Sequence, residues 1–218
     1  MKIFALLCVL LLPALASAGA YEDMEEALIH GDTAVVIKLL DRGMDVNTVD
    51  RTGDTLLILA VRRNMPELVD YLIKRRARLN NRNRNGETAL SIAAFTGKLA
   101  YVQRLVEAGA EVNFYGWPPL IYAAFNGHTA IVEYLLKRGA EIDAKTENGS
   151  SALYFAARNG HLEMISLLLA NKADPTIANE NDDTAVDAAM KANNSEILDL
   201  LRSAGGRSGK SLILDLSK

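Results

Sequence analysis

The sequence predicts an all-α fold, a solenoid of stacked repeats in which each unit is a helix pair followed by a projecting turn. A short phrase recurs every 30 to 33 residues, as in Gly86-Glu87-Thr88-Ala89-Leu90 and Gly149-Ser150-Ser151-Ala152-Leu153. Each phrase leads into a pair of small residues, and apolar residues at helical spacing follow. A fixed period of this length is typical of stacked repeats. Because a solenoid exposes one long face and encloses no deep pocket, the period favours a binding surface.

The first 18 residues are predicted to be a secretory signal peptide and not part of the fold. Lys2 precedes an apolar run over Ile3 to Leu12, and Ala16-Ser17-Ala18 has the small-x-small pattern of a cleavage site. A membrane anchor is the alternative, but the run is short beside the roughly 20 residues that a span needs. We therefore expect a mature chain that starts at Gly19 and has no stable membrane insertion.

Composition excludes several function classes. The single cysteine, Cys8, would leave with the signal, so we expect neither disulfides nor a catalytic thiol in the mature protein. The formal net charge of −3 gives no general reason to expect a nucleic-acid partner. Stability should then come from stacked apolar faces. Export without cysteines favours a periplasmic location, with secretion as the alternative.

The repeats align phrase by phrase, and their last residues are separated by 33, 30, 33 and 33 positions. Thr or Ser can cap a helix and Pro is tolerated in its first turn, so we expect a first helix to begin at each phrase and to end near a glycine. The aligned phrases are Thr55-Leu56-Leu57, Thr88-Ala89-Leu90, Pro118-Pro119-Leu120, Ser151-Ala152-Leu153 and Thr184-Ala185-Val186.

A second helix is expected after each first one, because apolar residues recur there with the helical period, as in Ile131, Val132 and Leu135. The segment from Tyr21 to Val49 is expected to be a degenerate unit whose second helix covers Thr33 to Arg42. The repeat domain is predicted to cover residues 19–206, with a C-terminal tail over residues 207–218.

The best-formed units resemble the ankyrin repeat family. Ala123-Ala124 with Asn126-Gly127-His128, and the matching residues from Ala156 to His161, follow the family's alanine pair and Gly-His step. The resemblance covers five recognisable repeats plus the degenerate N-terminal unit. It implies that the turns project as fingers, that the first helices line a concave groove, and that His128 and His161 tie neighbouring repeats together. We expect a monomer that binds another protein.

No residue set in the sequence predicts a catalytic, metal or cofactor site, so we expect a protein that is not an enzyme. The two repeat histidines are assigned to structure, and an enzyme that uses them is the alternative. The stretch from Ala204 to Ser211 matches a relaxed phosphate-loop pattern, but no strand precedes it and no helix is expected to follow. We expect the sequence from Arg207 onward to be a flexible exit. The apolar segment after it is expected to cover the last repeat or to bind a partner.

The shortened finger at Asn113-Phe114-Tyr115-Gly116-Trp117 is the predicted centre of partner binding. Three residues are lost here, and a polar tip is replaced by aromatic residues, which are enriched at binding hot spots. Phe95 and Phe125 end successive first helices. We expect a single patch of Phe95, Phe114, Tyr115, Trp117 and Phe125. In the alternative, Trp117 turns inward to fill the gap.

Basic residues form a second candidate group. Arg62 and Arg63 end a first helix, while Arg82 and Arg84 lie in the next finger, so these four can steer an acidic partner.

The sequence thus predicts an exported protein–protein interaction module that binds another envelope protein, as an inhibitor or self-protection partner of a periplasmic enzyme such as a cell-wall hydrolase. The alternatives are an accessory factor for a periplasmic redox enzyme or catalase, a secreted effector that binds host protein, and a tether to wall or membrane.

Overall fold

The structure is a computed structural model that describes residues 19–210. The chain divides into two compact units, Met1–Arg78 and Leu79–Lys218. The predicted signal peptide and the apolar segment after Ser211 lie outside the described residues. Among residues 19–210, no helix has the length and apolar character needed to cross a membrane.

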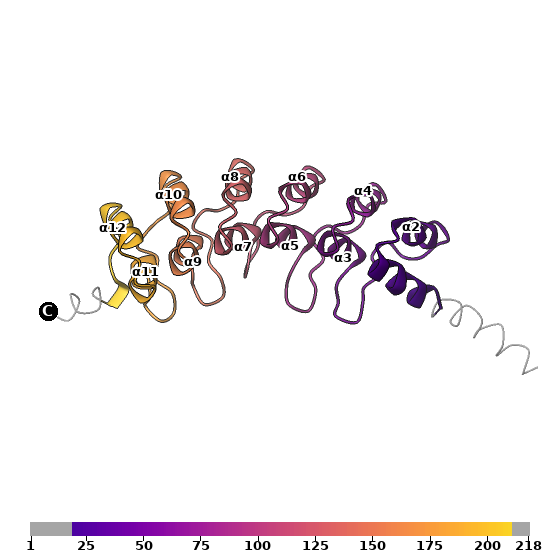
Figure 1. The fold of residues 1–218 in the computed structure, drawn as a ribbon, viewed down its shortest axis with the longest axis horizontal. Coiled ribbons are helices and arrows are strands. Elements are labelled where there is room, and N and C mark those ends of the chain that lie inside the picture. The colour runs from indigo at the N-terminus through magenta and orange to yellow at the C-terminus, as the bar shows by residue number, and fades with distance from the viewer. Residues whose placement is uncertain (1–18, 211–218) are drawn as a thin grey trace, which may run out of the picture. The chain divides into compact units, whose positions relative to one another are not determined.

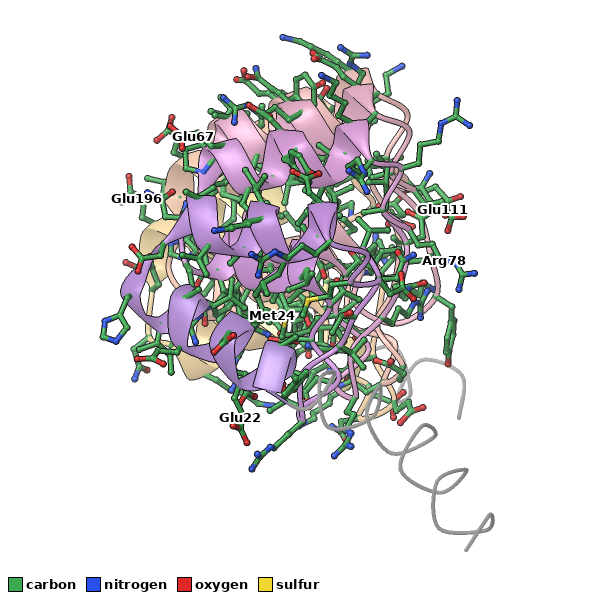
Figure 2. The ribbon with its side chains drawn as sticks, turned by 90° about the vertical axis from the view of Figure 1, so that its right-hand side faces the viewer. Glu22, Met24, Glu67, Arg78, Glu111 and Glu196 are labelled. Atoms are coloured by element: carbon green, nitrogen blue, oxygen red, sulfur yellow. The ribbon has the colours of Figure 1, made fainter. Side chains whose placement is uncertain are left out.

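The first unit contains the predicted degenerate repeat and one complete repeat. A helix over residues 19–30 precedes α2 (Thr33–Asp41), α3 (Leu56–Arg62) and α4 (Pro66–Lys74). Met24 is fully buried, whereas Glu22 on the same helix points outward (Figure 2). The helix expected over Thr33 to Arg42 ends one residue early, because Arg42 is a non-helical cap with ψ near 0°.

The second unit continues the alternation of short first helices and longer second helices (Figure 1). The first helices have seven residues and the second helices nine. The first helices are α5 (Ala89–Phe95), α7 (Pro119–Phe125), α9 (Ala152–Arg158) and α11 (Ala185–Lys191), and the second helices are α6 (Leu99–Glu107), α8 (Thr129–Lys137), α10 (Leu162–Ala170) and α12 (Ser195–Ser203). The predicted all-α solenoid is confirmed.

Each first helix begins at its aligned phrase, as predicted. The side chains of Thr88, Ser151 and Thr184 accept hydrogen bonds from backbone N–H groups of the first turn, which satisfies donors that a helix start leaves free. At α7 the cap position holds Pro118 and the first helical residue is Pro119, so no capping side chain is present; Pro119 has no N–H group that needs an acceptor. The sequence phrase therefore sets where each first helix begins.

Small residues let successive first helices pack closely. Ala123 and Ala124 have no exposed surface, and α7 packs against both α5 and α9. Leucines at the second-helix positions, such as Leu105 and Leu135, are also fully buried and complete the core between the two helix layers. Removing these side chains from water is the main stabilising contribution in such a stack.

The Asn-Gly-His phrases tie one repeat to the previous one through a main-chain oxygen. Asn126 Nδ2 donates to the carbonyl oxygen of Phe95 at 2.7 Å, and His128 Nε2 lies 3.1 Å from that oxygen. Asn159 and His161 repeat both contacts on the carbonyl oxygen of Phe125, at 2.7 and 2.9 Å. This geometry confirms the structural role expected for the two histidines.

A ladder of side-chain caps runs along the base of the fingers. The Oδ1 atoms of Asn80, Asn113 and Asp143 accept from backbone N–H groups that lie 31, 28 and 31 residues further on, at 3.0, 2.9 and 3.0 Å. The shorter separation follows from the three missing residues, and the loop before α7 is visibly the short one (Figure 1). The shortening therefore leaves the ladder intact and is confined to the finger tip.

The last repeat is closed by the segment that resembles a phosphate loop. The buried carboxylate of Asp187 accepts hydrogen bonds from Ser208 Oγ, from the Gly209 N–H at 2.8 Å and from the Thr184 N–H at 2.9 Å. Thr184 Oγ1 also donates to the carbonyl oxygen of Arg207 at 2.8 Å. The expected flexible exit is thus wrong for residues 207–210, which fold back onto α11.

Asp187 is buried in this arrangement, with 6% of its surface exposed. Burial raises the pKa of a carboxyl group, but the hydrogen bonds from Ser208, Thr184 and Gly209 outweigh it and lower the pKa of Asp187. The charged form is therefore the one that the fold stabilises.

Candidate functional site: an aromatic hollow on the first helices

The side chains at the end of α5 and around α7 form an open apolar hollow of about 210 Å³, here called the aromatic hollow. It is lined by Phe95, Trp117, Tyr122 and Phe125. Phe95 is 42% exposed and belongs to a contiguous apolar surface. Exposed aromatic area that is already ordered is a common feature of protein-binding surfaces.

Trp117 contacts three other aromatic rings at the base of the hollow. Its ring centroid lies 5.3 Å from that of Tyr122, 6.2 Å from Phe125 and 4.8 Å from Phe155. Phe155 itself is 3% exposed and stands 5.7 Å from Phe125. Trp117 is thus partly buried against the first helices, as the inward alternative held, while still forming part of the exposed wall.

Comparison of equivalent repeat positions shows what is unusual about this site. The residue before the helix cap and the last residue of the first helix form an acid–base pair in two repeats, Asp54 with Arg62 at 2.8 Å and Asp183 with Lys191 at 2.5 Å. In the repeat of α7 the same two positions hold Trp117 and Phe125. An ion pair that tolerates water is replaced here by an aromatic pair.

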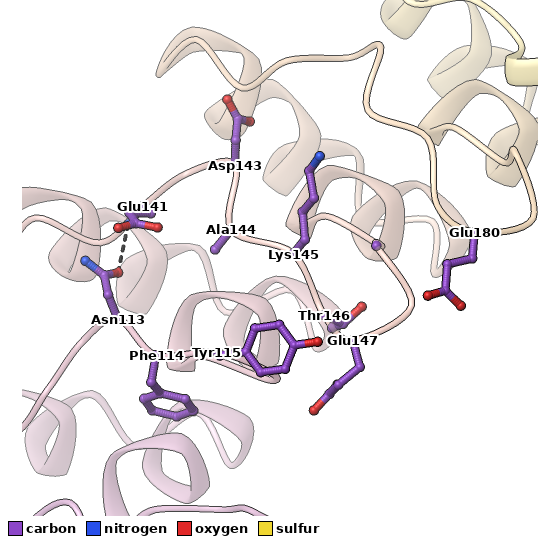
Figure 3. Close-up of a pocket in the computed structure, with 11 residues that line it drawn as sticks. Asn113, Phe114, Tyr115, Glu141, Asp143, Ala144, Lys145, Thr146, Glu147 and Glu180 are labelled. Atoms are coloured by element: carbon purple, nitrogen blue, oxygen red, sulfur yellow. Dashed lines mark hydrogen bonds between the residues drawn. The ribbon is translucent and has the colours of Figure 1, made fainter.

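A second, larger hollow of about 640 Å³ lies beside the shortened finger and is here called the finger hollow. Figure 3 shows Phe114 and Tyr115 together with Asp143, Lys145 and Glu147 of the next finger. Tyr115 is 74% exposed. The lining carries four carboxylates and one ammonium group, from Glu141, Asp143, Glu147, Glu180 and Lys145.

The structure separates the five aromatic residues that were expected to form one patch. Phe95, Trp117 and Phe125 line the aromatic hollow, whereas Phe114 and Tyr115 line the finger hollow. The single patch is therefore wrong. Phe114 and Tyr115 follow Asn113, which is fixed in the cap ladder, and Gly116, with φ of +102°, reverses the chain before Trp117. Because the positive φ of Gly116 turns the chain, Phe114 and Tyr115 before it line one hollow and Trp117 after it lines the other.

Two contributors to the hollow were not singled out from the sequence. Tyr122 occupies a first-helix position that reads as core, and Phe155 comes from the following repeat. Aligning the first helices of all repeats, column by column, would have placed Tyr122 beside Phe95 and Phe125 on one face.

The predicted basic residues are in different situations. Arg62 is held by buried Asp54, and Arg82 stacks on the Phe114 ring at 4.3 Å and reaches the carbonyl oxygen of Tyr115 at 3.4 Å. Arg63, in the first unit, and Arg84, in the second, are exposed. The structure thus gives Arg62 and Arg82 contacts within the fold, and Arg63 and Arg84 remain candidates for steering a partner.

Among residues 19–210, no group of His, Cys, Asp and Glu side chains has the arrangement needed to hold a metal ion. The repeated helix pairs, the inter-repeat ties and the surface-exposed aromatic hollow define the class of the protein, a helical repeat solenoid of the kind that binds proteins. The families described as ankyrin repeats (3 copies), matching residues 61–146 and 120–209, and ankyrin repeats (many copies), matching residues 24–73, cover most of the chain. The chain belongs to the ankyrin repeat family.

Several curated proteins contain similar segments. The chain is 36% identical over 90 residues to the nuclear factor NF-kappa-B p105 subunit of Rattus norvegicus, which is 40% of this chain and 9% of that protein. It is 34% identical over 95 residues to the ankyrin repeat domain-containing protein SAT10 of Stachybotrys chartarum, 44% of this chain and 5% of that protein. The matched segments span less than a tenth of either relative. Ankyrin repeats are protein–protein interaction modules, and this coarser part of the predicted function is confirmed.

Proposed function

We propose that this protein is an exported binding module that holds another protein of the cell envelope against the face formed by α5, α7 and α9, here called the first-helix face. The observation that carries the proposal is the aromatic hollow, where Trp117 and Phe125 replace the acid–base pair found in the repeats of α3 and α11. Aromatic side chains that are exposed yet ordered lose little entropy on binding.

The proposed partner is a periplasmic enzyme, such as a cell-wall hydrolase, that the module inhibits or keeps away from the cell that makes it. An apolar run and a cleavage pattern in residues 1–18 support export. A partner that is a redox enzyme or catalase would make the module an accessory factor, and a host protein would make it a secreted effector. The proposal assigns it no catalytic step of its own, since its repeat histidines are engaged with backbone oxygens.

Partner capture with a minimally disruptive variant tests the proposal. Residues 19–218 are immobilised and exposed to envelope extract from the source cell, with Phe95→Ala and Tyr115→Ala as parallel baits. Phe95 lines the aromatic hollow and is exposed, so its truncation should leave the fold intact. Tyr115 is a matched exposed aromatic residue of the other hollow.

We expect one stoichiometric envelope protein on the wild type and on Tyr115→Ala, and at least tenfold less on Phe95→Ala, since hot-spot truncations cost upwards of about 2 kcal/mol. Equal recovery on all three baits would exclude the aromatic hollow as the binding site. A first residue other than Gly19 in protein purified from the periplasm would contradict the cleavage site, and absence of the protein from the periplasm would contradict export.

A further inference from the structure

Arg158 lies on the helix that packs against α7, and among the described residues it is a cation without an ion-pair or hydrogen-bond partner. It is the last residue of α9, the position held by Phe95 in α5 and Phe125 in α7. The next residue, Asn159, donates to the carbonyl oxygen of Phe125, and Phe155, one turn earlier, contacts the rings of Trp117 and Phe125. Residues before and after Arg158 on the chain therefore contact residues of the hollow.

Within the part of the chain that the structure describes, no carboxylate pairs with Arg158. In the repeats of α3 and α11, the basic residue at this position pairs with an aspartate eight residues earlier, but here that residue is Ser150. Among the described residues, the Arg158 side chain has no hydrogen bond or ion pair.

The two buried acidic groups of the following repeat, Asp183 and Asp187, are already engaged. Asp183 pairs with Lys191 and with Lys210 at 3.5 Å, and Asp187 is bound by Ser208 and Gly209. Arg158 is exposed, and none of its five guanidinium N–H donors has a partner within residues 19–210.

We propose that the aromatic hollow and Arg158 together bind an acidic segment of the partner protein. A bulky apolar side chain of that segment enters between Phe95, Trp117 and Tyr122, and an Asp or Glu side chain of the same segment pairs with Arg158. Charge complementarity selects this occupant, because a carboxylate and a guanidinium form paired hydrogen bonds that a basic or neutral segment cannot supply. The inference rests on the proposed binding function and specifies its ligand chemistry.

A random peptide display library, selected on residues 19–218, tests the ligand chemistry without the natural partner. We expect enriched peptides to combine a large apolar residue with Asp or Glu. Selection on Arg158→Glu should enrich Lys or Arg in place of the acid. Binding of synthetic winning peptides should weaken about tenfold with Arg158→Gln, as expected for one charge-assisted hydrogen-bonded contact, and should be unchanged with Arg202→Gln, an exposed arginine of α12.

The outcomes separate this inference from the proposed function. Peptides that lose binding with Phe95→Ala but show no acidic preference would overturn the role of Arg158 and leave the hollow as a binding site. Failure to enrich any peptide would overturn recognition of a short segment, while envelope capture would still decide the proposed function. If a peptide with the sequence of residues 211–218 bound more tightly than the selected peptides, the ligand of the hollow would be the protein's own tail, and the proposed partner segment would be overturned.

Discussion

At the residue scale, the tie between repeats is accepted by main-chain oxygens, which substitution of Phe95 or Phe125 would not remove. Asn126 and His128 both bond the carbonyl oxygen of Phe95, and Asn159 and His161 bond that of Phe125. The glycine between each Asn and His has positive φ, and at Gly127 an added Cβ atom would also lie 2.9 Å from Nδ1 of His161. At Gly127 the missing side chain is therefore needed for both reasons.

Gly127→Ala tests this close approach. A Cβ atom at this position, with φ of +73°, would lie 2.9 Å from Nδ1 of His161. Gly139→Ala is the matched control, since its φ is +84° and nothing lies within 4 Å of the added atom. We expect the control to lose about 1–2 kcal/mol for the left-handed backbone, and Gly127→Ala to lose about 1 kcal/mol more through the disturbed His161 contact. Equal losses in urea unfolding would refute the contribution of His161.

The ionised carboxylate of Asp187 stabilises the folded protein, and this stabilisation is lost at acidic pH. Because the pKa of Asp187 is lower in the folded state than the ordinary value of 3.8, the ionised carboxylate stabilises the fold above that pH. This contribution is lost as the pH falls through the folded pKa. We expect Asp187→Asn to cost about 1 kcal/mol near pH 7, and its unfolding free energy to fall less steeply than that of wild type below about pH 4. Parallel pH profiles would contradict the assignment.

At the element scale, residues 207–210 act as the cover of the last repeat. Gly209 lies against the last finger, where a Cβ atom would stand 2.0 Å from the carbonyl oxygen of Asp182. Its N–H group donates to Asp187. Nothing but glycine fits this contact.

Gly209→Ala should therefore release this segment and increase hydrogen exchange in α11. We expect the loss of stability to overlap with that of Asp187→Asn, because both remove the same hydrogen bonds, so the double variant should cost less than the sum of the two single changes. Additive losses would mean that the segment is held by other contacts.

The helices were predictable from the sequence to within a residue or two, because most phrases contain a capping side chain and most turns a glycine, as at Thr88 and Gly97. The composition of the site was less predictable. Phe95, Trp117 and Phe125 were found from the shortened period, but Tyr122 and Phe155 required knowledge of which helix faces meet. Arg158 was missed because the sequence alone does not show that Asp54 pairs with Arg62, the equivalent residue of an earlier repeat. Only this pairing makes it significant that Ser150 stands eight residues before Arg158, where an aspartate would be expected.

At the scale of the whole molecule, contacts in the second unit run between successive repeats. α8 packs against α6, α7 and α10, whereas α12 contacts α10 and α11. In such a stack, stability is a sum of local contributions and interfaces between neighbours.

We therefore expect hydrogen exchange of backbone amides to be faster in α12 than in α8 under native conditions. An outer helix has fewer buried neighbours and opens at lower free energy than a central one. Equal protection in α12 and α8, measured by mass spectrometry of native exchange, would indicate that the unit unfolds only as a whole.

The use of the carbonyl oxygens of Phe95 and Phe125 as the tie has an evolutionary consequence. Every amino acid supplies that oxygen, so mutation can exchange the side chain at the end of a first helix while the join between repeats is inherited unchanged. The last residue of the first helix already varies within this chain, as Arg62, Phe95, Phe125, Arg158 and Lys191. New ligand preferences can thus arise by drift at these positions, at little risk to the scaffold that displays them.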